Sequence, residues 1–579
     1  MNLFADYRQQ VLACAHALWP EITATDAITL EPPRESAHGD MATNAAMVLA
    51  GQLKQNPRAI AEALATKLRN ISGVREVAIA GPGFINFRLD ENLWRALVPV
   101  MIREGNAFGD STLGKGQKIN VEYVSANPTG PLHIGHARGA VYGDGLAALL
   151  KKAGYDVTKE YYINDAGAQI EVLARSAYLR YREACGEAIG EIPEGLYPGE
   201  YLKPVGEALK AAHGDSLRNL PEAKWLPITQ RAAIDAMMAL IRHDLADLGI
   251  VHDVFTSEAA LKAAGMVEQA VTKLRAAGHV YEGVLAPPKG MVAEDWEAKE
   301  QLLFRSTDFG DDMDRTIAKS DGNYTYFAGD LALTLDKVAR GFSLLVYLFG
   351  ADHGGYVKRM EAITSALSEG KASADIKLCQ LVHLFKNGEP VRMSKRAGNF
   401  VTVRDVLDEV GKDILRFVML MRKSTQDMEF DLAKVKEQSK DNPVFYVQYA
   451  HARAKSLLRL AGEQMPEVLA RSAAPDHAGL ELLKHPAEMA LIKLLATYPR
   501  VIEQAALARE PHRIIYYLQE VAASFHGLWA AGSAGEEIRF IQPDKPELTA
   551  ARLALARAMA SGVASGLHVC GVQPVEELR

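Results

Sequence analysis

The chain has 579 residues, which is too long for a single hydrophobic core, so several domains are expected. Its hydrophobic content of 48% and charged content of 24% are ordinary for a soluble globular protein, and neither an 18-residue apolar run nor a signal-peptide pattern is present. The net charge of −7 neither indicates nor excludes an RNA partner, which would have to meet local basic surface.

The four cysteines, Cys14, Cys185, Cys379 and Cys570, lie far apart in the sequence, and no Cys-x-x-Cys pair occurs. This spacing argues against a structural zinc ribbon and against a disulfide scaffold, and it fits a reducing cytoplasm. We therefore expect a cytoplasmic protein without structural zinc or another resident metal. The cysteines are expected to be small buried hydrophobic residues.

Residues 1 to about 110 are predicted to form a separate α+β module. Apolar residues at helical spacing predict three helices, over residues 7–19, 45–53 and 59–68. Pro57 stands where the third helix would start, a position that proline favours. Alternating residues from 77 to 89, interrupted by a Gly-Pro-Gly turn, predict two strands.

A strand, a loop and a helix are predicted to meet at Asn127-Pro-Thr-Gly-Pro-Leu-His-Ile-Gly-His136. Residues 118–124 are typical of a buried strand, the prolines and glycine form a loop, and helical spacing follows. His133 and His136 can face one group at the helix N-terminus, where free N–H groups and the helix dipole favour phosphate. Gly135 lets a base or ribose lie against the backbone. Taken alone, however, this pair is more typical of helix capping.

A long insertion is predicted to divide the nucleotide-binding fold. The strand over 157–164 is followed by helical stretches around residues 166–185, 200–214 and 228–248. The second half of the fold begins near residue 320 and contains a buried strand over 342–349. That strand ends before Asp352 and His353, at the sheet edge where ligands gather. One further strand is predicted over 376–385, with a turn at Asn387-Gly388.

A basic loop follows at Val391-Arg-Met-Ser-Lys-Arg-Ala-Gly-Asn399. Lys395 is a cation on a loop that contains serine and glycine, so it can reach a triphosphate. An isolated lysine of this kind is usually a solvated surface charge. The order of the two motifs, on opposite sides of a long insertion, favours a shared role for them.

The rest of the chain is predicted to be almost entirely helical, with a linking segment over 405–441 and a bundle over 442–579. Tyr446-Val-Gln-Tyr-Ala-His-Ala-Arg453 places aromatic and basic side chains on one helix of this bundle, and such side chains can stack on unpaired bases. For each aromatic residue, packing in the bundle core remains the more common role.

His133-Ile-Gly-His136 and the loop around Lys395 resemble the two ATP-binding signatures of class I aminoacyl-tRNA synthetases. Ala37-His-Gly-Asp-Met-Ala-Thr-Asn44 and Gly81-Pro-Gly-Phe-Ile-Asn-Phe87 resemble the N-terminal module of arginyl-tRNA synthetases, and the resemblance extends to the C-terminal bundle. It implies an α/β multidomain protein. The expected parts are an α+β tRNA-contacting module (1–110), a Rossmann-like parallel-sheet catalytic domain (111–404, with a connective insertion at about 166–315), a linking helical segment (405–441) and an α-helical anticodon-binding domain (442–579).

The resemblance also implies the reaction, the partners and the site residues. Arginine is activated by ATP, with Mg²⁺ as part of the substrate complex, and is transferred to the 3′ end of tRNA(Arg) by a monomeric cytoplasmic enzyme that needs no membrane. The implied catalytic residues are His133, His136 and Lys395, and those contacting ATP are His133, Gly135, His136, Met393, Ser394 and Lys395. The implied arginine site comprises Glu122, Ser125, Asn127, His136, Tyr326, Asp330 and His353. The implied tRNA contacts are Phe84, Asn86, Phe87, Tyr449, Arg453 and Trp529.

Elementary chemistry agrees with this reading. Charge develops at the α-phosphate during activation, so fixed donors are needed more than a nucleophilic side chain. A guanidinium is recognised by carboxylates in a planar arrangement with an aromatic face nearby. Asp330 supplies such a carboxylate, although taken alone it is more typical of a helix N-cap.

Two other functions stay open at this point. A cysteinyl-type synthetase shares both signatures, but it should carry zinc-binding cysteines and no acidic guanidinium pocket. A non-catalytic RNA-binding paralogue would lose signature residues that are intact here. Some departures from the family pattern also occur: Arg392 and Arg396 replace the outer residues of the second signature, and the chain ends Glu577-Leu578-Arg579, so no terminal tRNA contact is inferred.

Overall fold

The computed structural model of the chain describes residues 2–285, 299–391, 401–474 and 479–578. The chain forms two compact units. The terminal unit comprises Met1–Ser111 and Gln438–Arg579, and the central unit comprises Thr112–Glu437. The N-terminal module and the C-terminal helices, which were expected as separate domains, thus belong to one unit.

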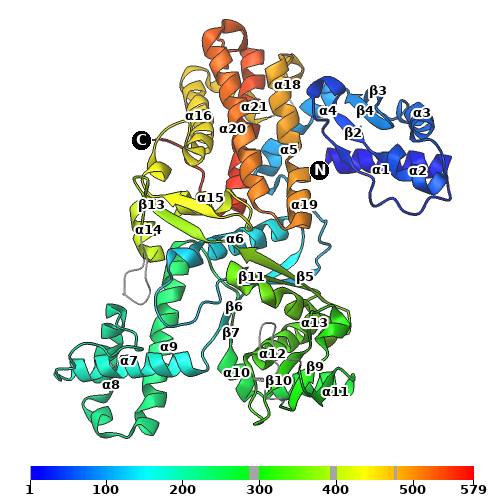
Figure 1. The fold of residues 1–579 in the computed structure, drawn as a ribbon. Coiled ribbons are helices and arrows are strands. Elements are labelled where there is room, and N and C mark those ends of the chain that lie inside the picture. Colours follow the sequence, from blue (N-terminus) through cyan, green and yellow to red (C-terminus); the bar gives the residue numbers. More distant parts are fainter. Residues whose placement is uncertain (1, 286–298, 392–400, 475–478, 579) are drawn as a thin grey trace. The chain divides into compact units, whose positions relative to one another are not determined.

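The N-terminal part of the terminal unit is an α+β module, as predicted (Figure 1). Its helices are α1 (Leu3–Leu18), α2 (Ala45–Leu53), α3 (Pro57–Leu68), α4 (Glu91–Arg95) and α5 (Leu97–Glu104). Its strands, β1 (Leu30–Glu31), β2 (Met41–Thr43), β3 (Val74–Ala80) and β4 (Phe84–Leu89), form an antiparallel sheet in the order β1-β2-β4-β3. Helix α3 begins where predicted, because the Asn56 side chain accepts from the Arg58 N–H and Pro57 is its first residue.

In the C-terminal part of the terminal unit, the described secondary-structure elements are all helices joined by short loops. Its helices are α16 (Pro443–Gln464), α17 (Pro466–Ala473), α18 (Pro486–Ala496), α19 (Tyr498–Ala508), α20 (His512–Ala534) and α21 (Pro546–Val569). Alanine is the most frequent residue of α21, so neighbouring helices can pack closely around it. A buried ion pair joins Arg552 Nε to Glu488 Oε1 at 2.6 Å and links α21 to α18.

A parallel five-stranded sheet organises the central unit, in the order β12-β11-β5-β6-β7 (Figure 1). Its strands are β5 (Lys118–Glu122), β6 (Asp156–Ile163), β7 (Val254–Ser257), β11 (Leu344–Gly350) and β12 (Ser373–Cys379). The chain order proceeds outward from β5 on one side and from β11 on the other. The boundary between β5 and β11 is therefore the switch point at whose carboxyl end open α/β sheets bind ligands.

Helices cover both faces of this sheet. The first is α6 (Ile134–Lys152), and α12 (Tyr326–Ala339) and α13 (Val357–Ser368) follow later in the chain. Tyr123 packs against Gly143 of α6, where a Cβ would lie 2.3 Å from Tyr123 Cγ, so only glycine allows this approach. Glu122, the residue before it, contacts Lys337 of α12. This alternation places α6 and α12 on opposite faces of β5.

The remaining elements of the central unit surround the main sheet. The helices are α7 (Ala168–Ala184), α8 (Lys203–His213), α9 (Glu222–Asp247), α10 (Glu258–Ala263), α11 (Met266–Ala276), α14 (Val403–Val410) and α15 (Lys412–Leu420). Two small sheets have the orders β10-β9-β8 and β14-β13-β15. Their strands are β8 (Val280–Gly283), β9 (Gln301–Phe304), β10 (Arg315–Ala318), β13 (Val382–Lys386), β14 (Glu389–Pro390) and β15 (Met428–Asp431).

Three strands differ from the sequence-based expectations. Strand β7 lies inside the segment expected as an insertion, yet it pairs with β6 in the main sheet. The single strand predicted over 376–385 is two strands, because the chain leaves the main sheet at Gln380, whose backbone is hydrogen-bonded to Ser424 and Arg138. Strand β15 interrupts the expected helical link over 405–441 and pairs with β13.

Candidate active site

The loop after β5 has a strained backbone. Val124 and Ser125 have φ angles of 69° and 39°, and the Ser125 N–H donates to the Tyr123 carbonyl at 3.0 Å across a γ-turn. Such conformations cost about 1–3 kcal/mol each and occur most often at functional sites. Strand β6 holds this loop, since the Tyr162 N–H donates to Ser125 Oγ at 3.0 Å and the Tyr161 hydroxyl donates to the Ala126 carbonyl at 2.7 Å.

His133 and His136 are fixed at the N-terminus of α6. His133 is the N-cap, and its Nδ1 accepts from the Gly135 N–H at 3.1 Å, while His136 Nδ1 accepts from the His133 N–H at 3.2 Å. The two rings stack with centroids 3.7 Å apart. Because each Nδ1 accepts a hydrogen bond, the proton of each neutral ring lies on Nε2. The capping interpretation is thus correct for both histidines, and it also orients both rings.

Backbone hydrogen bonds join the segment after the Lys395 motif to the segment that contains His133. Met393, Ser394 and Lys395 lie outside the described residues. The Ile134 N–H donates to the Val401 carbonyl at 3.1 Å, and the Val403 N–H donates to the Leu132 carbonyl at 2.8 Å. Two segments that are far apart in sequence are therefore neighbours at the start of α6.

Three carboxylates lie on the α12 side of the sheet. Glu122 Oε2 accepts from Lys337 Nζ at 2.5 Å, and its Oε1 accepts from Ser125 Oγ at 3.1 Å. Glu258, the first residue of α10, is buried and pairs with Lys262 at 2.6 Å. Asp330 lies one helical turn after Tyr326 within α12. It is not the N-cap, which is Thr325.

Asp330 differs from the other two carboxylates in its surroundings. Among the described residues, none forms an ion pair with it. Burial first, and then the charges of Glu122 and Glu258, raise the pKa of Asp330 to about 7, while Arg359 opposes the shift. A cation that binds from outside the chain would stabilise the ionised form of such a carboxylate.

The other residues predicted for the arginine site are more exposed. Tyr326, the first residue of α12, is 84% exposed. His353 follows β11, and its Nε2 lies 3.7 Å from Asp352 Oδ2. The Asn127 amide donates to Gln169 Oε1 at 2.8 Å. The structure brings Glu122 and Ser125 into direct contact, whereas these three residues lie toward the solvent.

In the terminal unit, the three predicted bundle residues lie together. The Arg453 guanidinium lies 4.1 Å from the Tyr449 ring centroid and 5.0 Å from that of Trp529. Its Nη2 donates to the Tyr449 hydroxyl at 2.6 Å. They line a cavity of about 470 Å³ together with Ala452, Ser456, Arg459, Glu577 and Leu578. Glu577 and Leu578, for which no tRNA contact was inferred, therefore line the same cavity.

The three predicted residues of β4 differ in exposure. Phe84 is 43% exposed, Asn86 is nearly buried and Phe87 is fully buried. Alternation along a strand predicted the sheet but did not indicate which face packs on the helices. Phe87 lies on the buried face, so its ring cannot stack on a base, and the prediction that it contacts tRNA is wrong.

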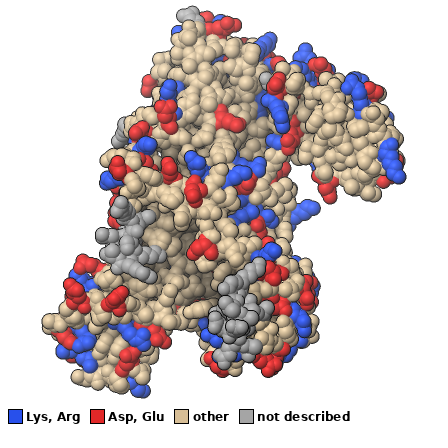
Figure 2. All heavy atoms as spheres, in the orientation of Figure 1, with Lys and Arg blue, Asp and Glu red and all other residues tan. Residues whose placement is uncertain are grey.

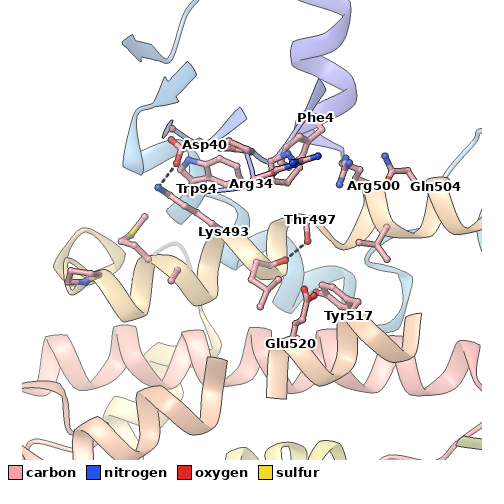
Figure 3. Close-up of a pocket in the computed structure, with 18 of the residues that line it drawn as sticks. Phe4, Arg34, Asp40, Trp94, Lys493, Thr497, Arg500, Gln504, Tyr517 and Glu520 are labelled. Carbon is pink, nitrogen blue, oxygen red and sulfur yellow. Dashed lines mark hydrogen bonds and ion pairs between the residues drawn. The ribbon is translucent and has the colours of Figure 1, made fainter. Parts of the chain in front are cut away.

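A larger cavity of about 920 Å³ lies within the terminal unit and contains no predicted site residue (Figure 3). Its charged groups are largely paired: Lys493 Nζ lies 2.6 Å from Asp40 Oδ1, and Arg500 Nη2 lies 3.3 Å from Glu31 Oε1. Paired groups of both signs do not single out one class of ligand.

Charges of both signs are interspersed over the face of the molecule that Figure 2 shows. Within the described parts of the chain, no group of His, Cys, Asp and Glu side chains is arranged to hold a metal ion. The helices described there include none that is long and apolar enough to cross a membrane. All four cysteines are free thiols, and only Cys570 is buried, so the expectation of burial was wrong for the other three.

Comparison with known proteins identifies the family. The chain is 56% identical to the protein named arginine–tRNA ligase of Xanthobacter autotrophicus, over 100% of both chains. The chain belongs to the arginyl-tRNA synthetase family. A relative of the same name from Rhizobium meliloti is also 56% identical over the full length of both chains. The solved structure of Thermus thermophilus arginyl-tRNA synthetase has a TM-score of 0.74, is 21% identical and shares the fold over 100% of both chains.

Three family models match successive parts of this arginyl-tRNA synthetase. They are described as the arginyl tRNA synthetase N terminal domain (residues 6–89), the class I (R) tRNA synthetase catalytic domain (98–189 and 288–453) and the DALR anticodon binding domain (447–578). The first model spans β4, and the third spans the Arg453 cavity.

Sequence reasoning missed several residues that surround the site of this synthetase. Lys337, Glu258 and Arg359 surround the carboxylates, and the Tyr201 hydroxyl donates to the Thr129 carbonyl at 2.9 Å. The available signal for Lys337 was a lysine seven residues after Asp330 in a mostly apolar helix, a spacing that places both on one helical face. Tyr201 gave no comparable signal, because it comes from the insertion.

Proposed function

We propose how this arginine–tRNA ligase divides its reaction between its residues. The class I catalytic domain uses ATP to activate arginine, and the arginyl group then passes to tRNA. The proposed site is the carboxyl end of β5, at the switch point of the parallel sheet. One observation carries the proposal: Asp330 is a carboxylate without an ion pair among the described residues, and the strand of the nearby Glu122 continues through a loop to His133 and His136 at the start of α6.

Arginine is proposed to bind with its guanidinium against Asp330 and Glu122. Two carboxylates can accept its N–H groups, and burial strengthens each charge-assisted hydrogen bond. The exposed ring of Tyr326 is placed one turn from Asp330 and can cover the guanidinium face. Ser125, Asn127, His136 and His353 are proposed to contact the rest of the amino acid.

ATP is proposed to bind at the N-terminus of α6. The His133 and His136 rings donate from Nε2 to phosphate oxygens, and Gly135 allows the nucleotide to approach the backbone. Met393, Ser394 and Lys395 complete this site, with Mg²⁺ entering as part of the ATP substrate. The ordered pairing of residues 401–403 with 132–134 supports their proximity.

The reaction needs no covalent bond to the enzyme. An oxygen of the arginine carboxylate attacks the α-phosphate, the bond to pyrophosphate breaks, and arginyl-adenylate forms. A 3′-terminal ribose hydroxyl of the tRNA then attacks the arginyl carbonyl, loses its proton and displaces AMP. Fixed donors stabilise the charge that develops on the phosphoryl oxygens.

The tRNA is proposed to contact two parts of the terminal unit. Tyr449, Arg453 and Trp529 form an anticodon-contact site in residues 442–579, and Phe84 and Asn86 contribute contacts in residues 1–110. Residues 111–404 form the catalytic domain, and 405–441 link it to the bundle. We further propose that the enzyme acts as a monomer in the cytoplasm, on tRNA(Arg).

ATP–pyrophosphate exchange tests the assignment. Exchange should require arginine and tRNA together, and Asp330→Asn should raise the KM for arginine by more than tenfold with little change in the KM for ATP, because a charged contact is lost. The matched control is Asp336→Asn on the same helix, where the carboxylate pairs with Arg340. Equal exchange with cysteine or lysine, or equal loss of arginine and ATP affinity in Asp330→Asn, would contradict the proposal.

A further inference from the structure

Lys337 is a fully buried cation beneath the proposed arginine site. Its Nζ lies 2.5 Å from Glu122 Oε2, with both side chains almost completely removed from solvent. It also lies 4.2 Å from the centroid of the Tyr347 ring. Burial alone lowers the pKa of Lys337, but Glu122, Tyr347 and Glu160 raise it more, so the net pKa is above its usual value. Lys337 is therefore a charged ammonium at any pH at which the enzyme works.

This ion pair fixes the orientation of Glu122. One carboxylate oxygen accepts from Lys337 and the other from Ser125 Oγ at 3.1 Å, so the group is held at both ends. Glu160, the other carboxylate near Lys337, has its own partners in Asn120, Thr256 and Arg340. Lys337 thus has Glu122 as its direct ionic partner.

The charge of Glu122 also acts on Asp330. The charged groups that act on Asp330 from the surrounding elements are Glu122 of β5, Glu258 of α10 and Arg359 of α13. Asp330 in turn raises the pKa of Tyr162 of β6, and Lys337 lies seven residues after Asp330 on the same helix. Glu258 is balanced by Lys262, and Glu122 by Lys337. Removal of the Lys337 charge would leave two unbalanced carboxylates side by side, a situation in which one of them takes up a proton.

We propose that Lys337 is a positioning residue for arginine recognition: it holds Glu122 in place and balances its charge, so that Glu122 and Asp330 can both face the guanidinium as carboxylates. This inference rests on the proposed function, in which these two carboxylates bind arginine. Lys337 itself does not touch the substrate. It allows both Glu122 and Asp330 to be ionised before arginine binds.

The test compares Lys337→Met with Lys337→Arg across pH 6 to 9, in the full chain with tRNA. In the wild type, kcat/KM for arginine should fall about tenfold per pH unit below pH 7, because protonated Asp330 no longer balances the guanidinium. Lys337→Met should move this fall to higher pH by about one unit and lower kcat/KM at pH 7 by about tenfold. Lys337→Arg, which keeps the charge, should retain the wild-type profile, and the KM for ATP should stay unchanged in both variants.

A double-mutant cycle keeps the inference testable if Lys337→Met folds poorly. Glu122→Gln with Lys337→Met removes both charges and leaves a neutral pair of similar size. Since Lys337 is inferred to act through Glu122, Lys337→Met should change the pH profile and the arginine KM much less in the Glu122→Gln background than in the wild type. Tyr347→Phe, which changes the other neighbour without changing charge, should behave as the wild type.

Each result separates the inference from the function on which it rests. A wild-type pH profile in Lys337→Met, or additive losses in the double variant, would overturn the positioning role. If Asp330→Asn itself left the arginine KM unchanged, the proposed guanidinium site would be wrong, and the inference would fail with it. A raised KM in Asp330→Asn with no shift in Lys337→Met would remove the inference alone.

Discussion

The proposed role of Asp330 requires its ionised form, which the folded protein disfavours. Its raised pKa of about 7 means that the folded enzyme holds the ionised form less readily than the unfolded chain does. Below the pKa that Asp330 has in the unfolded chain, the group is neutral in both states and does not lower the free energy of unfolding. As the pH rises through 7, the folded protein must accommodate a charge that burial disfavours, and the stability present at low pH is lost. A bound guanidinium would remove this penalty.

Replacement of Asp330 by asparagine should therefore stabilise the free enzyme at high pH while it weakens arginine binding. The gain is at most about 4 kcal/mol above pH 7, since each pKa unit corresponds to about 1.4 kcal/mol, and it should vanish near pH 4. Thermal melts at pH 4 and pH 8 measure it, with Asp336→Asn as the control. A lower melting temperature for Asp330→Asn at pH 8 would contradict this account, and a given concentration of added arginine should stabilise the wild type more than the variant.

The start of α6 combines a helix cap with the proposed ATP site. Gly135 lies where a Cβ would be 2.9 Å from the His133 ring, so the imidazole that caps the helix occupies the space of a side chain. Gly139, one turn later, has nothing within 4 Å of a Cβ built on it. The two glycines differ in their surroundings although they lie on the same helix.

Gly135→Ala should displace His133, weaken the cap by about 1 kcal/mol and raise the KM for ATP several-fold. Gly139→Ala should leave the kinetics unchanged and stabilise the helix by up to about 1 kcal/mol, because alanine has the higher helix propensity. Pyrophosphate exchange at varied ATP measures the first effect and urea unfolding the second. The same ATP KM in both variants would argue against a role for the His133 ring in ATP binding.

The long helices and the main strands could be predicted from the sequence because their patterns are local. Helix α2 has the bounds that apolar spacing predicts, and β5, β6 and β11 agree with the predicted strands to within a few residues. Strands β7 and β15 have four residues each and are defined by pairing with distant partners, which no local pattern records. The burial of Phe87 could not be predicted for the same reason. The contacts of Glu258 and Lys337 near the site also depend on residues that are distant in sequence.

At the scale of the molecule, the proposed catalytic and anticodon sites lie in different units. In the terminal unit, the Arg453 guanidinium lies near the Tyr449 and Trp529 rings, where the anticodon contact is proposed. The central unit contains the carboxylates and α6. Binding of tRNA at one unit and chemistry at the other can therefore be separated experimentally.

Arg453→Gln should raise the KM for tRNA by about tenfold or more, since stacking contacts contribute about 1–3 kcal/mol per base, while kcat at saturating tRNA and the KM for ATP stay near wild type. The control is Arg471→Gln, which changes an exposed arginine of the same unit that pairs with Glu547. Aminoacylation at varied tRNA measures the effect. An equal rise in the KM values of ATP and tRNA would indicate a general folding defect instead.

The pairing of β5 with β11 has a consequence for synthesis on the ribosome. Ile119 pairs with Leu344, so the centre of the catalytic sheet closes only after more than two hundred intervening residues have been made. Until then, β5 has an open edge on one side, and such edges invite association with other chains. Parallel pairing between distant segments also forms slowly. We expect nascent chains that stop before β11 to depend on chaperones far more than chains that have passed it.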